Sequence, residues 1–257
     1  MKGWIGVPSH TPCGYFQERT ATTEGAYLAE VASEELDLLL PLGIRHFAEE
    51  FFRPRCESCG RCLPLRVKVN EHVPSKNERR ILKRGRLFTS QLESPAASEE
   101  AWEIYLKHKQ RFPLDSEGEL DYATFCKVFF SPSPSHRILT LRDGKKLVLV
   151  SHIDITARSL SAVYCYYDSD YARYSPGTLA ILQELELARG RNIEYLYLGY
   201  WIEGHPHMDY KKKFAPNQLL LTGDSWYDYL GPGGETVLDG NIPLNFVAAR
   251  SFEELFS

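Results

Sequence analysis

Three cysteines at two-residue intervals, Cys56, Cys59 and Cys62, are the feature that most constrains how this chain can fold. Thiolates spaced in this way can converge on one centre, and Cys13 supplies a fourth from elsewhere. Four thiolates complete a tetrahedral zinc site or hold an iron–sulfur cluster, and three in a row are more typical of cluster ligation. The alternative is a tight turn with reduced thiols. The remaining two cysteines lie in apolar segments and are expected in the core.

A strongly basic segment surrounds and follows these cysteines. Residues 53–86 carry 11 Lys or Arg against 3 Asp or Glu, whereas the whole chain has a formal net charge of −4. A basic island on an acidic chain is typical of a binding site for a polyanion, although a solvated helix face has the same composition. We expect RNA, held mainly through its phosphates and therefore more weakly at high salt. The expected RNA contacts are Arg66, Lys76, Lys83, Arg84 and Arg86.

The rest of the composition indicates a globular, cytoplasmic protein. A chain of 257 residues with 43% hydrophobic content can bury a full core, as one large domain or two modest ones. No stretch approaches the roughly 20 apolar residues of a membrane span, and the first residues lack a signal-peptide pattern. Clustered cysteines are also unlike the disulfide framework of a small secreted protein.

The first part of the chain mixes irregular segments with short helices. Residues 1–25 are rich in Gly, Pro and Thr and are expected to be irregular. Ser33 can cap a short helix over residues 34–40, and residues 63–69 alternate as in a strand with one basic face. Residues 77–86 are predicted as a basic helix or turn. The further helices predicted before a Ser/Pro stretch at 131–134 cover residues 98–111 and 121–130.

After the Ser/Pro stretch the sequence becomes rich in β signals. The clearest helix, 175–190, has Ser175 as its cap, Pro at its first position and Gly at its end. The tail from residue 231 reads as a loop. Three strands are predicted before that helix, at residues 138–142, 146–155 and 160–167, and two after it, at 193–202 and 218–222. A short helix is predicted at 207–214, between the last two strands.

The order β, β, β, α, β, α, β is that of a GNAT-like acyltransferase fold, an α+β fold with a mixed, splayed sheet flanked by helices. We expect a Cys-rich basic region over residues 1–90 and a GNAT-like catalytic domain over 91–257. Residues 171–178 lack the Gly-rich turn that cradles the coenzyme A pyrophosphate in ordinary acetyltransferases. The acyl group would therefore come from another carrier.

Tyrosines end the two strands that would border the cleft of this fold. Tyr164 and Tyr166 precede Asp168 on one strand, and Tyr195 and Tyr197 lie on the next. Because alternate residues of a strand face the same side, each pair would line one wall, although aromatic strands also pack in cores. Asp168, at the carboxyl end of its strand, is the candidate functional carboxylate.

Several motifs, taken in order along the chain, carry a resemblance to a known family. They are Cys13-x-Tyr15, Arg53-Pro54-x-Cys56-x-x-Cys59-x-x-Cys62-x-Pro64-x-Arg66-Val67, Pro74-Ser75-Lys76-Asn77-Glu78-Arg79-Arg80, Ser161-Ala162-Val163-Tyr164-x-Tyr166-Tyr167-Asp168, Ser175-x-Gly177-Thr178, Tyr197-Leu198-Gly199-Tyr200-Trp201-Ile202 and Met208-x-Tyr210-Lys211. The chain resembles the aminoacyl-tRNA protein transferases of the arginyltransferase type, and more closely their bacterial branch, the aspartate/glutamate leucyltransferases. It departs from them at Ser169, where Pro is usual, and at Arg45-His46-Phe47, where an Arg-Arg-Ser-like turn is usual.

The resemblance implies transfer of an aminoacyl group from tRNA to the α-amine of proteins beginning with Asp or Glu, which marks them for N-degron degradation. We favour leucine as the transferred residue, with arginine as the alternative. Asp168 would hold and help deprotonate the amine, while Tyr166 or Tyr197 would bond the carbonyl or ribose. Lys211, Arg79 or Arg80 would pair with the acidic side chain. The full set of expected substrate-binding residues is Arg79, Arg80, Tyr164, Ser175, Thr178, Tyr200, Tyr210 and Lys211.

Two other functions remain open at this point. One is a transferase that takes aminoacyl-tRNA to a cell-wall precursor, which differs in its acceptor. The other is a non-catalytic tRNA-binding regulator that senses metal through its cysteines. The chemistry of ester aminolysis itself requires no cofactor, so zinc or an iron–sulfur cluster on Cys13, Cys56, Cys59 and Cys62 would be structural.

Overall fold

The smaller of two β-sheets is built from the first 54 residues. The computed structural model describes residues 1–111, 120–222 and 224–256. The small sheet has the order β1-β3-β5-β4, with β2 also paired to β3. Its strands are β1 (Lys2–Ile5), β2 (Ser9–Pro12), β3 (Thr20–Ala29), β4 (Arg45–Phe47) and β5 (Glu50–Pro54). The prediction that residues 1–25 are irregular is therefore wrong. Every residue of β1 and β2 is exposed, so these strands carry no buried alternation that could reveal them.

The larger sheet has eight strands in the order β13-β12-β6-β11-β10-β9-β8-β7. Among the strands of the described residues, only the β10–β11 pair of this sheet is parallel, and every other neighbouring pair is antiparallel. The turn at Asp143 and Gly144 joins two of these strands in the hairpin that the sequence predicts. The strands are β6 (Leu63–Lys68), β7 (Thr89–Glu93), β8 (His136–Asp143), β9 (Lys146–Ile155), β10 (Ser159–Tyr167), β11 (Tyr195–Trp201), β12 (Asn217–Leu221) and β13 (Ser225–Leu230).

The helices agree with the sequence predictions in number and place within the central part of the chain. The α-helices are α1 (Ser33–Leu39), α2 (Lys76–Gly85), α3 (Glu99–Lys109), α4 (Tyr122–Phe130), α5 (Pro176–Gly190) and α6 (Phe252–Phe256). Short 3₁₀ turns are η1 (Leu40–Leu42), η2 (Val69–Glu71), η3 (Ser169–Tyr174) and η4 (Asp209–Lys213). One predicted cap is wrong, because Ser33 lies inside its helix after the N-cap residue Ala32. Ser175 occupies the predicted N-cap position of its helix, but it has a left-handed backbone and its side chain makes no capping hydrogen bond.

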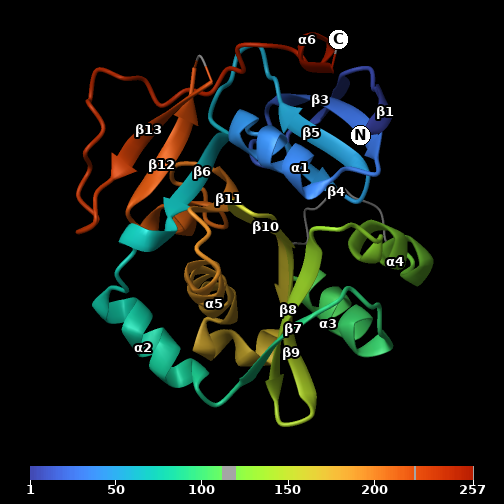
Figure 1. The fold of residues 1–257 in the computed structure, drawn as a ribbon, viewed down its shortest axis with the longest axis vertical. Helices are drawn as coiled ribbons and strands as arrows, with labels where there is room; N and C mark the ends of the chain where they lie inside the picture. Colours follow the sequence, from blue (N-terminus) through green and yellow to red (C-terminus); the bar gives the residue numbers. More distant parts are fainter. Residues whose placement is uncertain (112–119, 223, 257) are drawn as a thin grey trace.

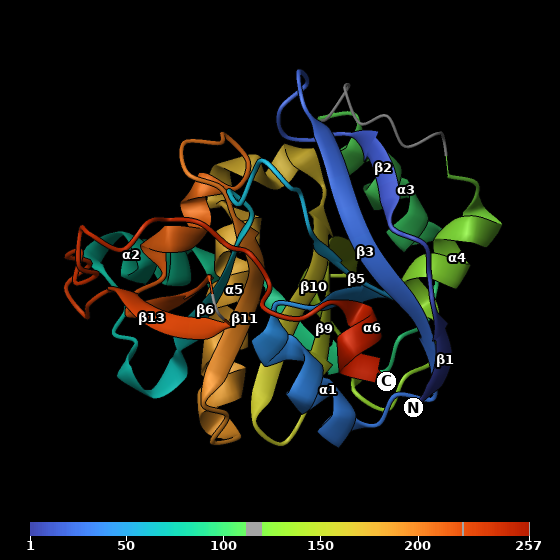
Figure 2. The same ribbon diagram turned by 90° about the horizontal axis from the view of Figure 1, so that it is seen from above.

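Helices cover both faces of the large sheet, which confirms a mixed α+β architecture. On one face α5 packs on the sheet and α2 packs on α5 (Figure 1). On the other face lie α3 and α4, which form an aromatic cluster, and the small sheet with α1 and α6. Figure 2 shows these two sides on either side of β9 and β10. Alternation along the strands explains the division, because Leu196 and Leu198 face α5 whereas Tyr197 faces the small sheet.

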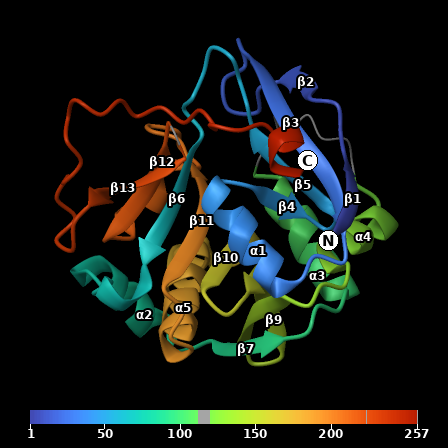
Figure 3. The ribbon, with the colours of Figure 1, turned by 45° about the horizontal axis from the view of Figure 1, so that its top comes forward.

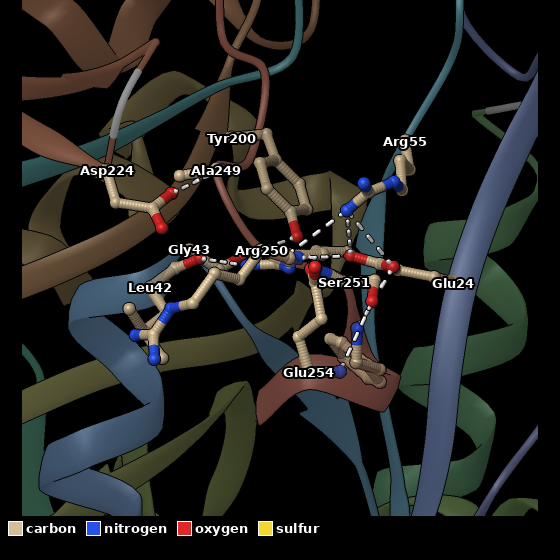
Figure 4. A network of polar contacts seen from close by, with 12 residues as sticks. Glu24, Leu42, Gly43, Arg55, Tyr200, Asp224, Ala249, Arg250, Ser251 and Glu254 are labelled. Atoms are coloured by element: carbon tan, nitrogen blue, oxygen red, sulfur yellow. Dashed lines mark hydrogen bonds and ion pairs between the residues drawn. The ribbon is translucent and has the colours of Figure 1, made fainter. Parts of the chain in front are cut away.

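The chain after β13 returns to the small sheet. Helix α6 lies in the tail that was expected to be a loop, and strand β13 lies between the last predicted strand and that tail, where no element was predicted. Figure 3 shows this segment crossing from β13 to α6, which lies beside β3. Polar contacts fix it there (Figure 4). Buried Arg53 donates to Glu24 Oε1 at 2.5 Å and to the carbonyl of Arg250, while the Phe252 amide donates to Glu24 Oε2.

Strands β10 and β11 part along their length, and we call this place the β10–β11 split. Their pairing covers only Ser159–Ser161 with Tyr195–Tyr197, although both strands continue beyond it. A bulge follows in each strand, and Gly199 takes a left-handed φ of +73°. Because the strands diverge instead of pairing, the split leaves room for side chains from other elements.

Strands from both ends of the chain share the large sheet. Strand β6 lies between β11 and β12, and the predicted boundary at residue 90 falls within β7. The two-part division of the chain stays a prediction. Within the residues that the structure describes, none of the helices combines the length and apolar character of a membrane span.

Candidate active site at the β10–β11 split

Arg45 of β4 holds the β10–β11 split from the side of the small sheet. Its guanidinium donates to Ser161 Oγ at 3.0 Å and to the Ala162 carbonyl. A Cβ added to Gly199 would lie 3.6 Å from Arg45 Nε, so the guanidinium also lies against the backbone of β11. Burial lowers the pKa of Arg45, and Tyr200 and Asp154 oppose that shift. The sequence singled Arg45 out only as a departure from the family motif.

Lys211 places a second cation near Arg45. It is half-buried in η4, and its Nζ donates to the Tyr200 carbonyl at 2.9 Å. Burial and then Arg45 lower the pKa of Lys211 to about 7, against a smaller effect of Cys62 in the other direction. The Tyr200 hydroxyl is buried and donates to the Gly43 carbonyl at 2.9 Å. Two of the predicted substrate-binding residues, Lys211 and Tyr200, therefore meet. Among the described residues Lys211 makes no ion pair, so its charge is available to a ligand.

The four predicted metal ligands lie near one another beside this pair of cations. Cys13, Cys56, Cys59 and Cys62 are free thiols and half-buried. Burial raises the pKa of Cys62 to about 12, and the other three thiols add to that rise while Lys211 opposes it. The Thr22 amide donates to Cys56 Sγ at 3.3 Å. In the parts of the chain that the structure describes, no three His, Cys, Asp or Glu side chains have the geometry of a metal site.

The predicted catalytic carboxylate is fully engaged in ion pairs. Asp168 is 3% exposed, pairs with Lys107 of α3, and lies 2.8 Å from Lys146 Nζ of β9. Burial works against its charge, but the hydrogen bonds from both lysines lower the pKa of Asp168 to about 2. A carboxylate held in this way is a poor proton acceptor at neutral pH, so this geometry argues against Asp168 as a base.

The tyrosines predicted to line the cleft pack in the interior. Tyr164 and Tyr166 share one side, as predicted, with ring centroids 6.2 Å apart. That side belongs to the aromatic cluster of α3 and α4, and Tyr166 is fully buried within it. Tyr197 is buried against the small sheet, and its hydroxyl accepts a bond of 3.1 Å from Arg66. Tyr210 is 37% exposed in η4, next to Lys211.

The predicted RNA contacts divide into two groups. Arg66 lies among aromatic rings, 3.7 Å from the Tyr195 centroid and 4.2 Å from that of Trp226, and it also bonds Gln218. The others lie on or beside α2, whose only acid, Glu78, is buried as part of the helix cap. The exposed basic residues of this helix and its end are Lys76, Arg79, Arg80, Lys83, Arg84 and Arg86.

The close packing of α2 on α5 explains how this basic face points outward. A Cβ on Gly85 would lie 2.6 Å from Leu179, so only glycine lets the two helices approach at this point. Ile81 is buried on the same side. Ser175 and Thr178, the remaining predicted substrate-binding residues, are half-buried in the first turn of α5.

Comparison with known proteins gives matches along nearly the whole chain. The family model for the N terminus of arginine-tRNA-protein transferases matches residues 11–80, and the model for their C terminus matches residues 100–221. An aspartate/glutamate leucyltransferase of Stenotrophomonas maltophilia (strain K279a) is 32% identical, over 85% of this chain and 90% of its own. One from Shewanella sp. (strain ANA-3) is 32% identical, over 86% of this chain and 93% of its own. The solved structure of FemX aligns with a TM-score of 0.47 at 8% identity, covering 77% of this chain and 69% of that one, a likeness too low to bear on the fold.

Proposed function

The chain belongs to the arginine-tRNA-protein transferase family, and we propose on that premise that it aminoacylates proteins that begin with Asp or Glu. It is an aminoacyltransferase whose substrates are an aminoacyl-tRNA and a protein. The relatives named aspartate/glutamate leucyltransferase favour leucine as the transferred residue, and the name of the family model keeps arginine as the alternative. The observation in the structure that carries the proposal is the pair of cations, Arg45 and Lys211, at the β10–β11 split.

The proposed architecture of the site is a GNAT-like cleft. In that fold two neighbouring parallel strands diverge and the acyl group enters between them. Strands β10 and β11 are parallel, pair over three residues and then separate, which supports this assignment. The donated ester carbonyl would then lie near Arg45, which spans the two strands at this point. We place the reaction in the cytoplasm, where charged tRNA is available, and the product would enter N-degron degradation.

The exposed basic face of α2 is the proposed contact for tRNA. Six cations face solvent there, and the one acid of the helix is buried. Phosphates of an RNA backbone are recognised by such a surface without base readout, which suits an enzyme that must accept a tRNA by its shape. Arg66 is excluded from this contact because aromatic rings and Gln218 already surround its guanidinium.

The main requirement of the reaction is that the protein positions the amine against the ester carbonyl. An aminoacyl ester is already activated, so aminolysis needs an uncharged amine near the carbonyl and donors for the developing oxyanion. A protein α-amine has a pKa near 8, so a dedicated base would gain only about tenfold at neutral pH. Orientation supplies on the order of 7–11 kcal/mol of barrier reduction. The ion-paired Asp168 is therefore not required as a base, and it serves to hold the end of β10 against α3 and β9.

The cysteine cluster is proposed to hold a thiophilic group that fixes the wall of the cleft. Four thiols near one another are the donor set of zinc or an iron–sulfur cluster. Burial raises the pKa of Cys62 first, and the other three thiols add to that rise because they lie close to it. A group bound by Cys13, Cys56, Cys59 and Cys62 would supply structure rather than chemistry. We expect protein purified without oxygen to contain about one equivalent of zinc or cluster iron, and a Cys59→Ser, Cys62→Ser variant to lose it. Metal-free protein with full transferase activity would contradict this.

Transfer to defined peptides tests the proposed function. Labelled Leu-tRNA and Arg-tRNA are each incubated with peptides that differ only in a first residue of Asp, Glu or Ala. We expect label on the Asp and Glu peptides from Leu-tRNA and little on the Ala peptide. Transfer from Arg-tRNA instead would establish the alternative donor. Binding of charged tRNA with no transfer to any peptide would overturn the proposal in favour of a non-catalytic regulator.

A further inference from the structure

A pocket between the small sheet and α4 adjoins the β10–β11 split, and neither Lys211 nor the basic face of α2 lines it. Its walls are apolar and come from both sheets and α4; they include Leu28, Val31, Phe47, Val128 and Val163. Val163 is the bulged residue of β10, at the point where that strand leaves β11. Since the lining is mostly aliphatic and aromatic, the pocket suits a compact apolar group.

The floor of this pocket carries a buried carboxylate with an oxygen that lacks a partner. Asp154 of β9 is 1% exposed, and its Oδ2 lies 2.8 Å from His46 Nε2. Its Oδ1 is buried and makes no hydrogen bond to the described residues. Burial opposes the charge of Asp154, but His46, through its charge and its hydrogen bond, and then Arg45 hold the pKa of the Asp154 carboxyl below its usual value. An ionised oxygen that is buried without a donor is costly unless a ligand supplies one.

The charges around the pocket favour a cation. Its lining, among the described residues, contains no Lys or Arg but holds the exposed Glu30 and Glu49 and the buried Asp154. The one opposing charge among these lining residues is His46, since burial lowers its pKa but the charge and hydrogen bond of Asp154 raise it above the usual value. The pKa values of His136 and His152, the other two histidines of the floor, are lowered by burial, so both are neutral. A ligand with an acidic side chain is therefore repelled, and one with an ammonium group beside an aliphatic side chain is attracted.

The position of the pocket connects it with the reaction. Asp154 is directly paired across the sheet with Ser161, which is the residue that Arg45 binds. Arg45 lies at the split, the next residue, His46, binds Asp154, and Phe47 lines the wall. A group bound on Asp154 is thus within one strand spacing of the place where β10 and β11 part.

We propose that this pocket binds the aminoacyl group of the charged tRNA, with its free α-ammonium on Asp154 Oδ1 and an aliphatic side chain against Val163 and Val128. The inference rests on the proposed function and extends it, because it assigns the donor amino acid to a subsite and favours a neutral aliphatic side chain over a guanidinium. The acceptor protein is excluded from this pocket since its acidic first residue would meet three carboxylates.

Binding of L-leucinamide to the full chain tests the proposal without tRNA or transfer. The amide stands in for the ester and leaves the α-ammonium and isobutyl group in place. We expect L-leucinamide to bind at least tenfold more tightly than 4-methylpentanamide, which lacks the ammonium, and more tightly than L-argininamide. Equal affinity for leucinamide and 4-methylpentanamide, or tighter binding of argininamide, would overturn the assignment.

Two variants and one control locate the binding site. Asp154→Asn removes the carboxylate, and we expect at least a tenfold loss of leucinamide affinity. Val163→Phe fills the pocket from β10 and keeps the test valid if Asp154→Asn does not fold. Val247→Phe, at a residue 45% exposed outside the pocket, is the matched control and should bind normally. Wild-type affinity in both pocket variants would exclude this site.

The same variants separate this inference from the proposed function. If wild-type protein transfers leucine to Asp peptides and the pocket variants do so equally well, the subsite assignment falls and the transferase function stands. If leucinamide binds as expected but no charged tRNA donates its amino acid, the transferase function falls while the amine pocket stands.

Discussion

Replacing Arg53 with alanine is expected to lower the free energy of unfolding by about 3–5 kcal/mol, the largest stability effect that we foresee from one substitution. Arg53 is 0% exposed and directly opposite Glu24 across β3 and β5. It donates to Glu24 Oε1, to the Leu42 carbonyl at 3.1 Å and to the Arg250 carbonyl. The substitution would leave the charge of Glu24, which is 5% exposed, with Arg55 at 3.5 Å as its nearest cation, and it would strand the Leu42 carbonyl. The Arg250 carbonyl would keep its hydrogen bond of 3.1 Å from Arg55.

Thermal or denaturant unfolding measures this effect, with a fall in Tm of roughly 10 °C expected. Arg55→Ala is the matched control. Arg55 also reaches Glu24, at 3.5 Å, but its side chain is 38% exposed, so a loss of no more than about 1 kcal/mol is expected. A second readout is amide hydrogen exchange near Arg250 and Phe252, which should speed up because both are fixed through this network (Figure 4). Equal losses from the two substitutions would contradict the central role of Arg53.

A double substitution separates the contribution of the Arg53–Glu24 ion pair from that of the other hydrogen bonds of Arg53. Arg53→Met with Glu24→Leu removes both charges and keeps apolar volume between the strands. Because most of the cost of Arg53→Ala is the unpaired carboxylate, the double variant should be less destabilised than the sum of the single ones. Additive losses would mean that the carbonyl contacts, and not the ion pair, dominate.

The sequence was most informative where local signals and burial agree. Helix α5 has Pro176 at its first position and an apolar face, and the structure has it over the predicted residues. The hairpin of β8 and β9 follows from Asp143 and Gly144 between two apolar runs. In these places neighbouring residues alone determine the local conformation, so no knowledge of distant contacts was needed.

The sequence was least informative where a residue's partners come from distant segments. The position of Asp168 at the end of β10 was predicted, but Lys107 of α3 and Lys146 of β9, which decide its pKa, could not be. Nothing in the sequence around Arg45 indicated that its side chain would bind Ser161 and Ala162 on the other sheet. The exposed strands β1 and β2 were missed because edge strands in contact with solvent keep no apolar period.

Replacing Lys211 with glutamine is expected to lower kcat/KM for an acceptor peptide beginning with Asp by about 10- to 100-fold. A hydrogen bond to a charged group contributes about 1.5–3 kcal/mol, and about 1.4 kcal/mol corresponds to a factor of ten. The physical reason is that burial and Arg45 lower the pKa of Lys211 and so disfavour its ammonium form. The carboxylate of a bound acidic residue would favour that form again. An acidic first residue would relieve that repulsion, and a neutral one would not.

Comparison of acceptor peptides that begin with Asp or Asn shows whether Lys211 recognises the acidic side chain. The preference for a peptide beginning with Asp over one beginning with Asn should shrink in Lys211→Gln, while transfer to the Asn peptide stays at its wild-type rate. Lys213→Gln is the matched control, since Lys213 is an exposed residue of the same turn, η4. Unfolding of each variant should be measured as well, because Lys211 also donates to the Tyr200 carbonyl. If Lys211→Gln slows both peptides equally while the protein stays folded, Lys211 acts on the common aminolysis step and the acidic residue is recognised elsewhere.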